Sequence, residues 1–424
     1  MKSTPPPPLM KLADTGLGDR FLLTLLIKNM LRFGYDKPMA MATALCLPVP
    51  IVEEIISVGR EAKLLQTLGA LGASMSAELR YELTDAGRAW GNDALRQSEY
   101  TGPAPVPLEQ FADQVARQSI RNETIGRQAL EHVLKGLIIS DTISDAVGPA
   151  ANSASSMLFY GPPGNGKSSI ANAICAAFQD VIYVPHAIEI DRQVITVFDG
   201  TVHRAVDEEA GGGGLRAAGG HDKRFQVCKR PVVVTGGELT INMLDLSYNP
   251  VSRIYEAPLQ MKAAGGVFVI DDFGRQREQP QALINRWIIP LEQGTDFLML
   301  QTGRKFEAPF DTLVIFSTNI PPKQLVDDAA LRRIRHKIEI GRPTQDMFIR
   351  IFYEACKRRK IALTEDILTF LLTDLYAVEN APFAAFQAEF LLDQVTSICA
   401  YEGIEPQLTE DFLKRAWRNL FTTA

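Results

Sequence analysis

The chain has 424 residues and a formal net charge of −6, with 46% hydrophobic and 22% charged residues. These proportions are typical of a globular protein with a sizeable core, and they exclude a mainly disordered chain. The net charge gives no general attraction to nucleic acid, although a local basic face would still be compatible with it. Because no apolar run approaches the roughly 20 residues needed to span a bilayer, and the start of the chain lacks a secretory signal, we expect a cytoplasmic protein with no membrane span.

The first hundred residues predict a short leader and a small α+β domain. Residues 1–18 contain a run of four prolines and are expected to form a disordered leader. Residues 19–100 contain two amphipathic helical patterns, two strand patterns around "GASMSA" and a closing segment "LRYELTDAGRAW". This order resembles a winged helix-turn-helix domain, in which the helix from about Val49 to Lys63 would occupy the recognition position.

The charges on that helix bear on what it would contact. Glu53, Glu54 and Glu61 outnumber Arg60 and Lys63, whereas contact with DNA phosphates requires the opposite balance. The domain is therefore predicted to dock onto a protein, and a purely structural role is about equally compatible with the sequence.

The rest of the chain divides into an α/β part and a helical part. Residues 101–107 supply prolines typical of an extended linker. Residues 108–342 alternate β-branched runs with helical patterns, which predicts a parallel α/β sheet. Within this part, residues 181–264 read as a strand-rich insertion, and its glycine-rich stretch 208–220 as a mobile loop. Residues 343–424 predict a helical domain, with threonine N-caps followed by acidic residues.

A phosphate-binding loop is the strongest chemical signal. "MLFYGPPGNGKSSIANAICAAF" places the pattern G-x-x-x-x-G-K-[ST] between a strand pattern and a helical pattern, which is the context that this motif requires. In this interpretation Lys167 neutralises the β- and γ-phosphate oxygens, and the Ser168 hydroxyl is a Mg²⁺ ligand. The predicted nucleotide-binding set is Gly161, Pro162, Pro163, Gly164, Asn165, Gly166, Lys167, Ser168 and Ser169. An accidental glycine-rich turn is the simpler alternative, and both flanking elements argue against it.

A second motif follows about a hundred residues later. The apolar run Val267–Ile270 leads directly into two adjacent carboxylates, Asp271 and Asp272. A nucleoside triphosphatase places its second metal-binding group at such a position. We therefore predict that Asp271 holds the Mg²⁺ shell and that Asp272 orients and deprotonates the attacking water. Two solvated acids at a strand end are the alternative.

With these two motifs, residues 130 to 424 resemble the AAA+ ATPases. "DTLVIFSTNIPP" is similar to the sensor-1 strand of that family, which implies that Asn319 positions the water and the γ-phosphate. "LVDDAALRRIRHKIEI" is similar to the segment that carries arginine fingers, which implies that Arg332 and Arg333 act on the nucleotide of a neighbouring subunit. A solvated helix end is the alternative for these arginines. Strand patterns around Thr302-Gly303 predict a β-hairpin before sensor 1, as in one broad clade of the family.

The chain departs from the family pattern in two places. The family usually has glutamate where this chain has Asp272, which is one methylene shorter. Residues 382–395, where a sensor-2 arginine is expected, contain neither arginine nor lysine. That contact is therefore expected to be missing or supplied from elsewhere in the chain.

Taken together, the motifs and the resemblance, which is to a bacterial group of the family, imply an ATP-hydrolysing AAA+ mechanoenzyme with ATP and Mg²⁺ as cofactors. The resemblance implies a homo-oligomeric ring, expected to be a hexamer, that remodels or assembles an unidentified protein partner. One alternative is a DNA-associated regulator or loader that uses the winged-helix-like domain. Another is a nucleotide-dependent scaffold with little turnover.

Overall fold

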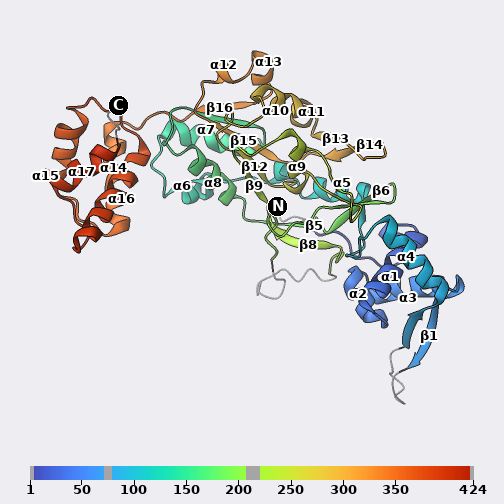
Figure 1. The fold of residues 1–424 in the computed structure, drawn as a ribbon. Helices are drawn as coiled ribbons and strands as arrows, with labels where there is room; N and C mark the ends of the chain where they lie inside the picture. The colour runs from blue at the N-terminus through green and yellow to red at the C-terminus, as the bar shows by residue number, and fades with distance from the viewer. Residues whose placement is uncertain (1–3, 71–78, 207–219, 421–424) are drawn as a thin grey trace.

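The computed structural model describes residues 4–70, 79–206 and 220–420. Figure 1 shows three parts, with a small N-terminal domain and a helical C-terminal domain at opposite ends of a central α/β body. The two strands predicted around "GASMSA" are present as an antiparallel pair, whereas residues 72–77 between them and most of the glycine-rich stretch 208–220 lie outside the described residues.

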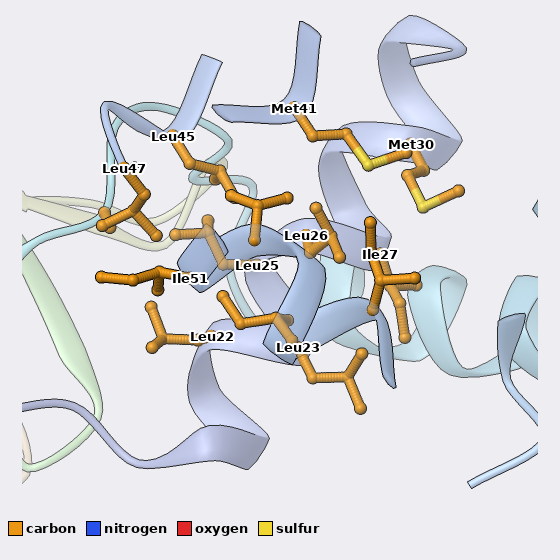
Figure 2. Close-up of a cluster of buried hydrophobic side chains, with 14 of the residues drawn as sticks. Leu22, Leu23, Leu25, Leu26, Ile27, Met30, Met41, Leu45, Leu47 and Ile51 are labelled. Atoms are coloured by element: carbon orange, nitrogen blue, oxygen red, sulfur yellow. The ribbon is translucent and has the colours of Figure 1, made fainter. Parts of the chain in front are cut away.

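The N-terminal domain consists of three helices, an antiparallel strand pair and a fourth helix. Its elements are α1 (Asp19–Phe33), α2 (Pro38–Leu45), α3 (Val49–Glu61), β1 (Leu65–Ala70), β2 (Leu79–Leu83) and α4 (Asp85–Gln97). The apolar faces of α1, α2 and α3 meet in one buried cluster (Figure 2). Three residues connect α2 to α3, and these two helices cross at 110°. A short turn and a near-perpendicular crossing are the geometry of a helix-turn-helix.

None of the described helices is by itself long and apolar enough to cross a membrane. The bent pair α2–α3, taken together, has the length and apolar composition of a membrane span, but by these two criteria alone.

Residues 4–18 have a defined path, which differs from the disorder expected of the leader 1–18. A short 3₁₀ helix, η1 (Leu12–Thr15), follows the prolines, and Leu9, Leu12 and Leu17 are buried in the core of the N-terminal domain. Local composition indicated disorder, but these three leucines obtain their burial from tertiary contacts. The leader is therefore part of the folded unit.

Residues 101–107 are likewise packed. Ala104 and Val106 are fully buried, and the backbone N–H of Ala104 donates to the carbonyl of Leu45. The segment ends in β3 (Val106–Pro107), which pairs with β6 (Ala187–Ile190). The predicted linker thus attaches the N-terminal domain to the central body.

The central body contains a five-stranded parallel sheet. Its order is β9 (Val232–Thr235), β12 (Val267–Ile270), β15 (Leu313–Thr318), β4 (Met157–Tyr160) and β16 (His336–Glu339). The helices around it are α6 (Arg127–Leu134), α7 (Asp141–Asn152), α8 (Lys167–Ala177), α9 (Leu259–Lys262), α10 (Pro280–Arg286), α11 (Ile288–Gln293), α12 (Pro322–Leu325) and α13 (Asp328–Leu331). Apolar clusters lie on both faces, as the continuous apolar strands require. The carboxyl ends of β4, β12 and β15 form one edge, where α/β proteins bind ligands.

The strand-rich segment 181–264 is divided by β9, which belongs to the central sheet. The other strands build a second β unit on α5 (Leu108–Arg117). It consists of a sheet of β10 (Ser247–Asn249), β11 (Ile254–Glu256), β7 (Gln193–Thr196), β6 and β3, and of the pair β5 (Val181–Pro185) with β8 (Phe225–Lys229). "RPVVVTG" therefore supplies a core strand and does not belong to an insertion.

The predicted hairpin before the sensor-1 strand is confirmed. β13 (Thr295–Met299) and β14 (Lys305–Pro309) are antiparallel, and Leu298 is buried whereas Phe297 and Met299 are exposed. The C-terminal part is all helical, as predicted. It contains α14 (Gln345–Arg359), α15 (Glu365–Phe370), the π-helix η4 (Leu371–Tyr376), α16 (Ala385–Glu402) and α17 (Glu410–Leu420) around a separate core.

Candidate nucleotide site

The loop between β4 and α8 has the backbone of a phosphate cradle. Gly161, Gly164 and Gly166 have φ values of 136°, 74° and 88°, a region that side chains disfavour. Gly161 also leaves no room for a side chain, since a Cβ there would lie 2.3 Å from the carbonyl oxygen of Ile340. The loop ends at the first turn of α8, whose free N–H groups and dipole favour an anion.

Lys167 extends across this loop. Its Nζ donates to the carbonyl oxygens of Gly161 at 3.0 Å and Pro162 at 2.9 Å. It also donates to Oδ1 of Asn319 at 2.6 Å. Burial lowers the pKa of this ammonium group, while the neighbouring Asp271 and Asp272 raise it. The cation is therefore held in the loop and is available to phosphate oxygens.

The side-chain oxygens of Ser168 and Asp271 lie next to each other. The Ser168 hydroxyl donates to Oδ2 of Asp271 at 2.7 Å, joining the start of α8 to the end of β12. Within the described parts of the chain, no group of three or more His, Cys, Asp or Glu side chains is placed to hold a metal ion by itself. Mg²⁺ usually takes one or two protein oxygens and completes its shell with water and nucleotide phosphates. The hydroxyl and carboxylate of this pair fit such an ion.

Asp272 projects from the next residue. Its backbone has φ 48°, in the left-handed region, and its N–H donates to Oδ1 of Asp271 at 3.0 Å. The Asn319 side chain donates from Nδ2 to Oδ1 of Asp272 at 3.2 Å. Hydrogen bonds thus link Lys167, Asn319 and Asp272, and the structure brings together the predicted residues of the loop, of β12 and of β15.

These side chains face a cavity of about 610 Å³. The phosphate loop and the ends of β12 and β15 form one side. Gly136–Ile139, between α6 and α7, adds an apolar wall, and α14 and α16 contribute Ile351, Glu354, Arg358, Phe386 and Glu389. The volume is within the range of small-molecule sites, and the mixture of apolar and charged walls suits a nucleotide.

The C-terminal domain contacts the phosphate loop directly. At the start of α16, the Phe386 N–H donates to the carbonyl of Gly164 at 2.9 Å, and the Ala385 N–H donates to Oδ1 of Asn165 at 3.1 Å. A Cβ at Gly164 would lie 2.2 Å from the ring of Phe386. Where a sensor-2 arginine was expected, α16 thus presents an aromatic ring and two backbone donors.

Sequence reasoning missed a cation of this domain. Arg358 of α14 lines the cavity and pairs with Glu389, which also accepts from Arg359 at 2.5 Å. Arg359 in turn pairs with Asp393 at 2.6 Å. Arg358 lies in the run "CKRRK", which looks like an ordinary basic helix end. Its spacing from the start of α16 gave no signal, because only the tertiary packing of α14 on α16 brings it to the cavity.

Arg332 and Arg333 are not among the residues that line this cavity. Arg332 is exposed just after α13, whereas Arg333 is half-buried, with its Nε 3.0 Å from Glu292 and its Nη1 bonded to the carbonyl of Ala329. The structure therefore distinguishes two arginines that were equivalent in the sequence, and Arg332 is the one available to another molecule.

A comparison with family models matched residues 344–419 to a domain of unknown function, DUF8689. The match covers the helical C-terminal domain. The search of curated proteins found no match.

Among solved structures, NtrX from Brucella abortus in complex with ADP aligns with 80% of this chain and 68% of its own, at 12% identity and a TM-score of 0.43. NtrX in complex with ATP aligns over 79% of this chain and 64% of its own, at 13% identity and a TM-score of 0.40. A RuvB mutant from Thermotoga maritima aligns over 71% and 73%, at 14% identity and a TM-score of 0.37. The chain thus spans about two thirds of the NtrX length.

Because these TM-scores are low, the fold assignment rests on this chain's own features. Those features are the parallel sheet β9-β12-β15-β4-β16, the phosphate loop after β4, the acidic pair after β12 and the helical domain that closes the cavity. Together they form a P-loop nucleotide-binding fold, and they are the features on which the resemblance to the AAA+ ATPases rests.

Proposed function

We propose that the protein binds and hydrolyses ATP with Mg²⁺ at the cavity above β4, β12 and β15. One observation carries the proposal. Lys167, Ser168, Asp271, Asp272 and Asn319 come from three separate segments and converge in one hydrogen-bonded set. Phosphoryl transfer to water requires a cation, metal ligands, a base and a group that positions the water, and this set supplies all four.

Each side chain has a distinct role. The Lys167 ammonium moves from the carbonyls of Gly161 and Pro162 to the β- and γ-phosphate oxygens. Ser168 and Asp271 would hold Mg²⁺, which when bound would neutralise charge on the phosphates. Asp272 accepts the proton of the attacking water, and Asn319 orients that water.

The adenine is proposed to pack against the apolar wall Gly136–Ile139, since this wall adjoins the phosphate loop in the same cavity. Arg358 supports binding from the side of the C-terminal domain. Lys167 and Arg358 are the two cations among the described residues that line the cavity. A nucleoside triphosphate carries more negative charge than a single lysine neutralises.

Activity is proposed to require a ring of subunits, with a hexamer as the expected form. Arg332 is exposed and does not line the cavity of its own subunit, so the Arg332 of a neighbouring copy would add a third cation to Lys167 and Arg358. Turnover would then depend on assembly.

The ring is proposed to act on a protein partner recruited through the N-terminal domain. The α2–α3 crossing gives this domain the form of a helix-turn-helix, which also fits a DNA-directed role. However, Glu53, Glu54 and Glu61 are exposed on α3, and their charge opposes contact with phosphates. Protein docking is therefore the favoured role.

Phosphate release tests the proposed activity. The wild-type protein should release phosphate from ATP in the presence of Mg²⁺ and not in the presence of EDTA, and Lys167→Ala should abolish both tight ATP binding and release. Release that persists in a folded Lys167→Ala protein would show that the reaction occurs elsewhere. Tight binding with no release by the assembled wild type would instead support the scaffold alternative.

A further inference from the structure

The turn after β12 is held in an uncommon conformation. Asp272 has φ 48° and Gly274 has φ 102°, so the chain reverses sharply within residues 271–276. A left-handed backbone is disfavoured for residues with a side chain, although aspartate and asparagine tolerate it better than most. Such a backbone persists where its surroundings hold it in place. The groups that hold this turn therefore determine where the Asp272 carboxylate points.

Gln276 is the side chain that closes this turn. It is buried, and its Nε2 donates to the carbonyl of Gly236 at 3.1 Å and to that of Asp271 at 3.2 Å. The Asp272 carbonyl lies 3.4 Å from the same nitrogen. Because an amide has two N–H groups, the two shorter contacts use both and the third is shared.

The other end of this amide is also bonded. Gln276 Oε1 accepts a hydrogen bond from the Gly274 N–H at 2.8 Å. The side chain thus connects the peptides on both sides of Asp272 and joins them to Gly236, the residue directly after the neighbouring strand β9. A side chain lacking either the donor or the acceptor would leave buried polar groups unpaired.

We propose that Gln276 is a positioning residue for hydrolysis, which holds Asp272 in the left-handed conformation that directs its carboxylate toward Asn319 and the attacking water. This inference rests on the proposed ATPase function. Gln276 bonds to backbone groups and is not among the described residues that line the cavity. Its loss should therefore affect turnover far more than nucleotide binding, because Lys167, Ser168 and the phosphate loop are left intact.

A double-mutant cycle tests this role with the full-length protein. Gln276→Ala should lower kcat about tenfold or more, since small misplacements at a reacting centre are costly, while KM for ATP changes by less than about twofold. In an Asp272→Asn background, the same Gln276→Ala change should have almost no further effect, because the group it positions no longer accepts a proton. Gln407→Ala, at an exposed glutamine of the C-terminal domain, is the control for glutamine loss.

The outcomes separate the positioning role from the proposed function. An equal loss of kcat in both backgrounds, or a wild-type kcat in Gln276→Ala, would overturn the positioning role while leaving ATP hydrolysis in place. A fall in thermal stability with kcat unchanged in the folded fraction would show a merely structural glutamine. No turnover by the assembled wild-type protein would overturn the proposed function and the role of Gln276 with it.

Discussion

Asn319 bonds simultaneously to Lys167 and to Asp272, accepting from the lysine at 2.6 Å and donating to the aspartate at 3.2 Å. One amide thus connects the cation assigned to the phosphates with the base assigned to the water. In the proposed function Lys167 would turn to a phosphate, which would leave the Asn319 oxygen free to accept from water. We therefore expect phosphate binding and water positioning to be coupled through this side chain.

Asn319→Ala should lower turnover by roughly 10²-fold, the scale expected for losing a group that assists proton transfer or orients the nucleophile. ATP affinity should change little, because the phosphate loop and Lys167 remain. Steady-state phosphate release together with a nucleotide-binding titration separates the two effects. Asn319→Asp is the informative comparison, since its added negative charge should retain Lys167 and weaken ATP binding. Equal affinities for both variants would contradict the coupling.

Arg332→Ala should abolish turnover by the assembled protein, whereas Arg333→Ala should retain most of it, because Arg333 is already paired with Glu292. Mixing provides the check. An inactive Arg332→Ala protein and an inactive Lys167→Ala protein should partly restore phosphate release when combined. Demonstrated co-assembly without any recovery would argue against action across a subunit boundary.

Arg358→Ala should weaken ATP binding by about tenfold, a typical effect of losing one charge-assisted contact of roughly 1.4 kcal/mol. AMP binding should be affected less, because the proposed contact is with the phosphates. Arg359→Ala is the matched control on the same helix, since Arg359 pairs with Glu389 and Asp393 and is not among the cavity-lining residues. If Arg359→Ala bound ATP more weakly than Arg358→Ala, Arg359 and not Arg358 would be the arginine that contacts the phosphates.

Arg224→Ala should lower the free energy of unfolding by about 3 kcal/mol or more, the scale for leaving one partner of a buried ion pair unpaired. Arg224 is fully buried, pairs with Asp222 at 2.7 Å, and donates to the carbonyls of Thr15 and Pro105. It therefore fastens the leader and residues 101–107 to the central body. Denaturant unfolding, with the exposed Arg117→Ala as control, measures the effect. A change below about 1 kcal/mol would show that these contacts are dispensable.

Site residues that belong to a continuous sequence motif could be predicted, whereas a residue brought in by tertiary packing could not. The strand, loop and helix around Gly161–Ser169 are contiguous, so one stretch of sequence predicted the loop and its ligands. Asp271, Asp272 and Asn319 were found because each directly follows an apolar strand, and parallel strands bring their carboxyl ends to one edge. The role of Arg358 was not predicted, because the sequence of α14 alone does not indicate that this helix packs on α16.

Tertiary context also decided the remaining differences. The leader was expected to be disordered from its prolines, but Leu9, Leu12 and Leu17 have partners that lie far along the chain. The strand Val232–Thr235 was assigned to an insertion because it is one of several strand-like pieces between the two nucleotide-binding motifs, and only the pairing with β12 places it in the central sheet. Propensity identified these segments as extended or irregular, whereas their partners could not be deduced from it.

The most direct test of the account compares ATP binding and phosphate release in Asp272→Asn and Asp271→Asn. The account predicts that Asp272→Asn binds Mg²⁺-ATP nearly as tightly as the wild type while its turnover falls by roughly 10²-fold or more, because the amide cannot accept a proton. Asp271→Asn should instead weaken binding and its Mg²⁺ dependence together. Wild-type phosphate release by both variants would contradict the account, since the acidic pair would then be two solvated groups at a strand end.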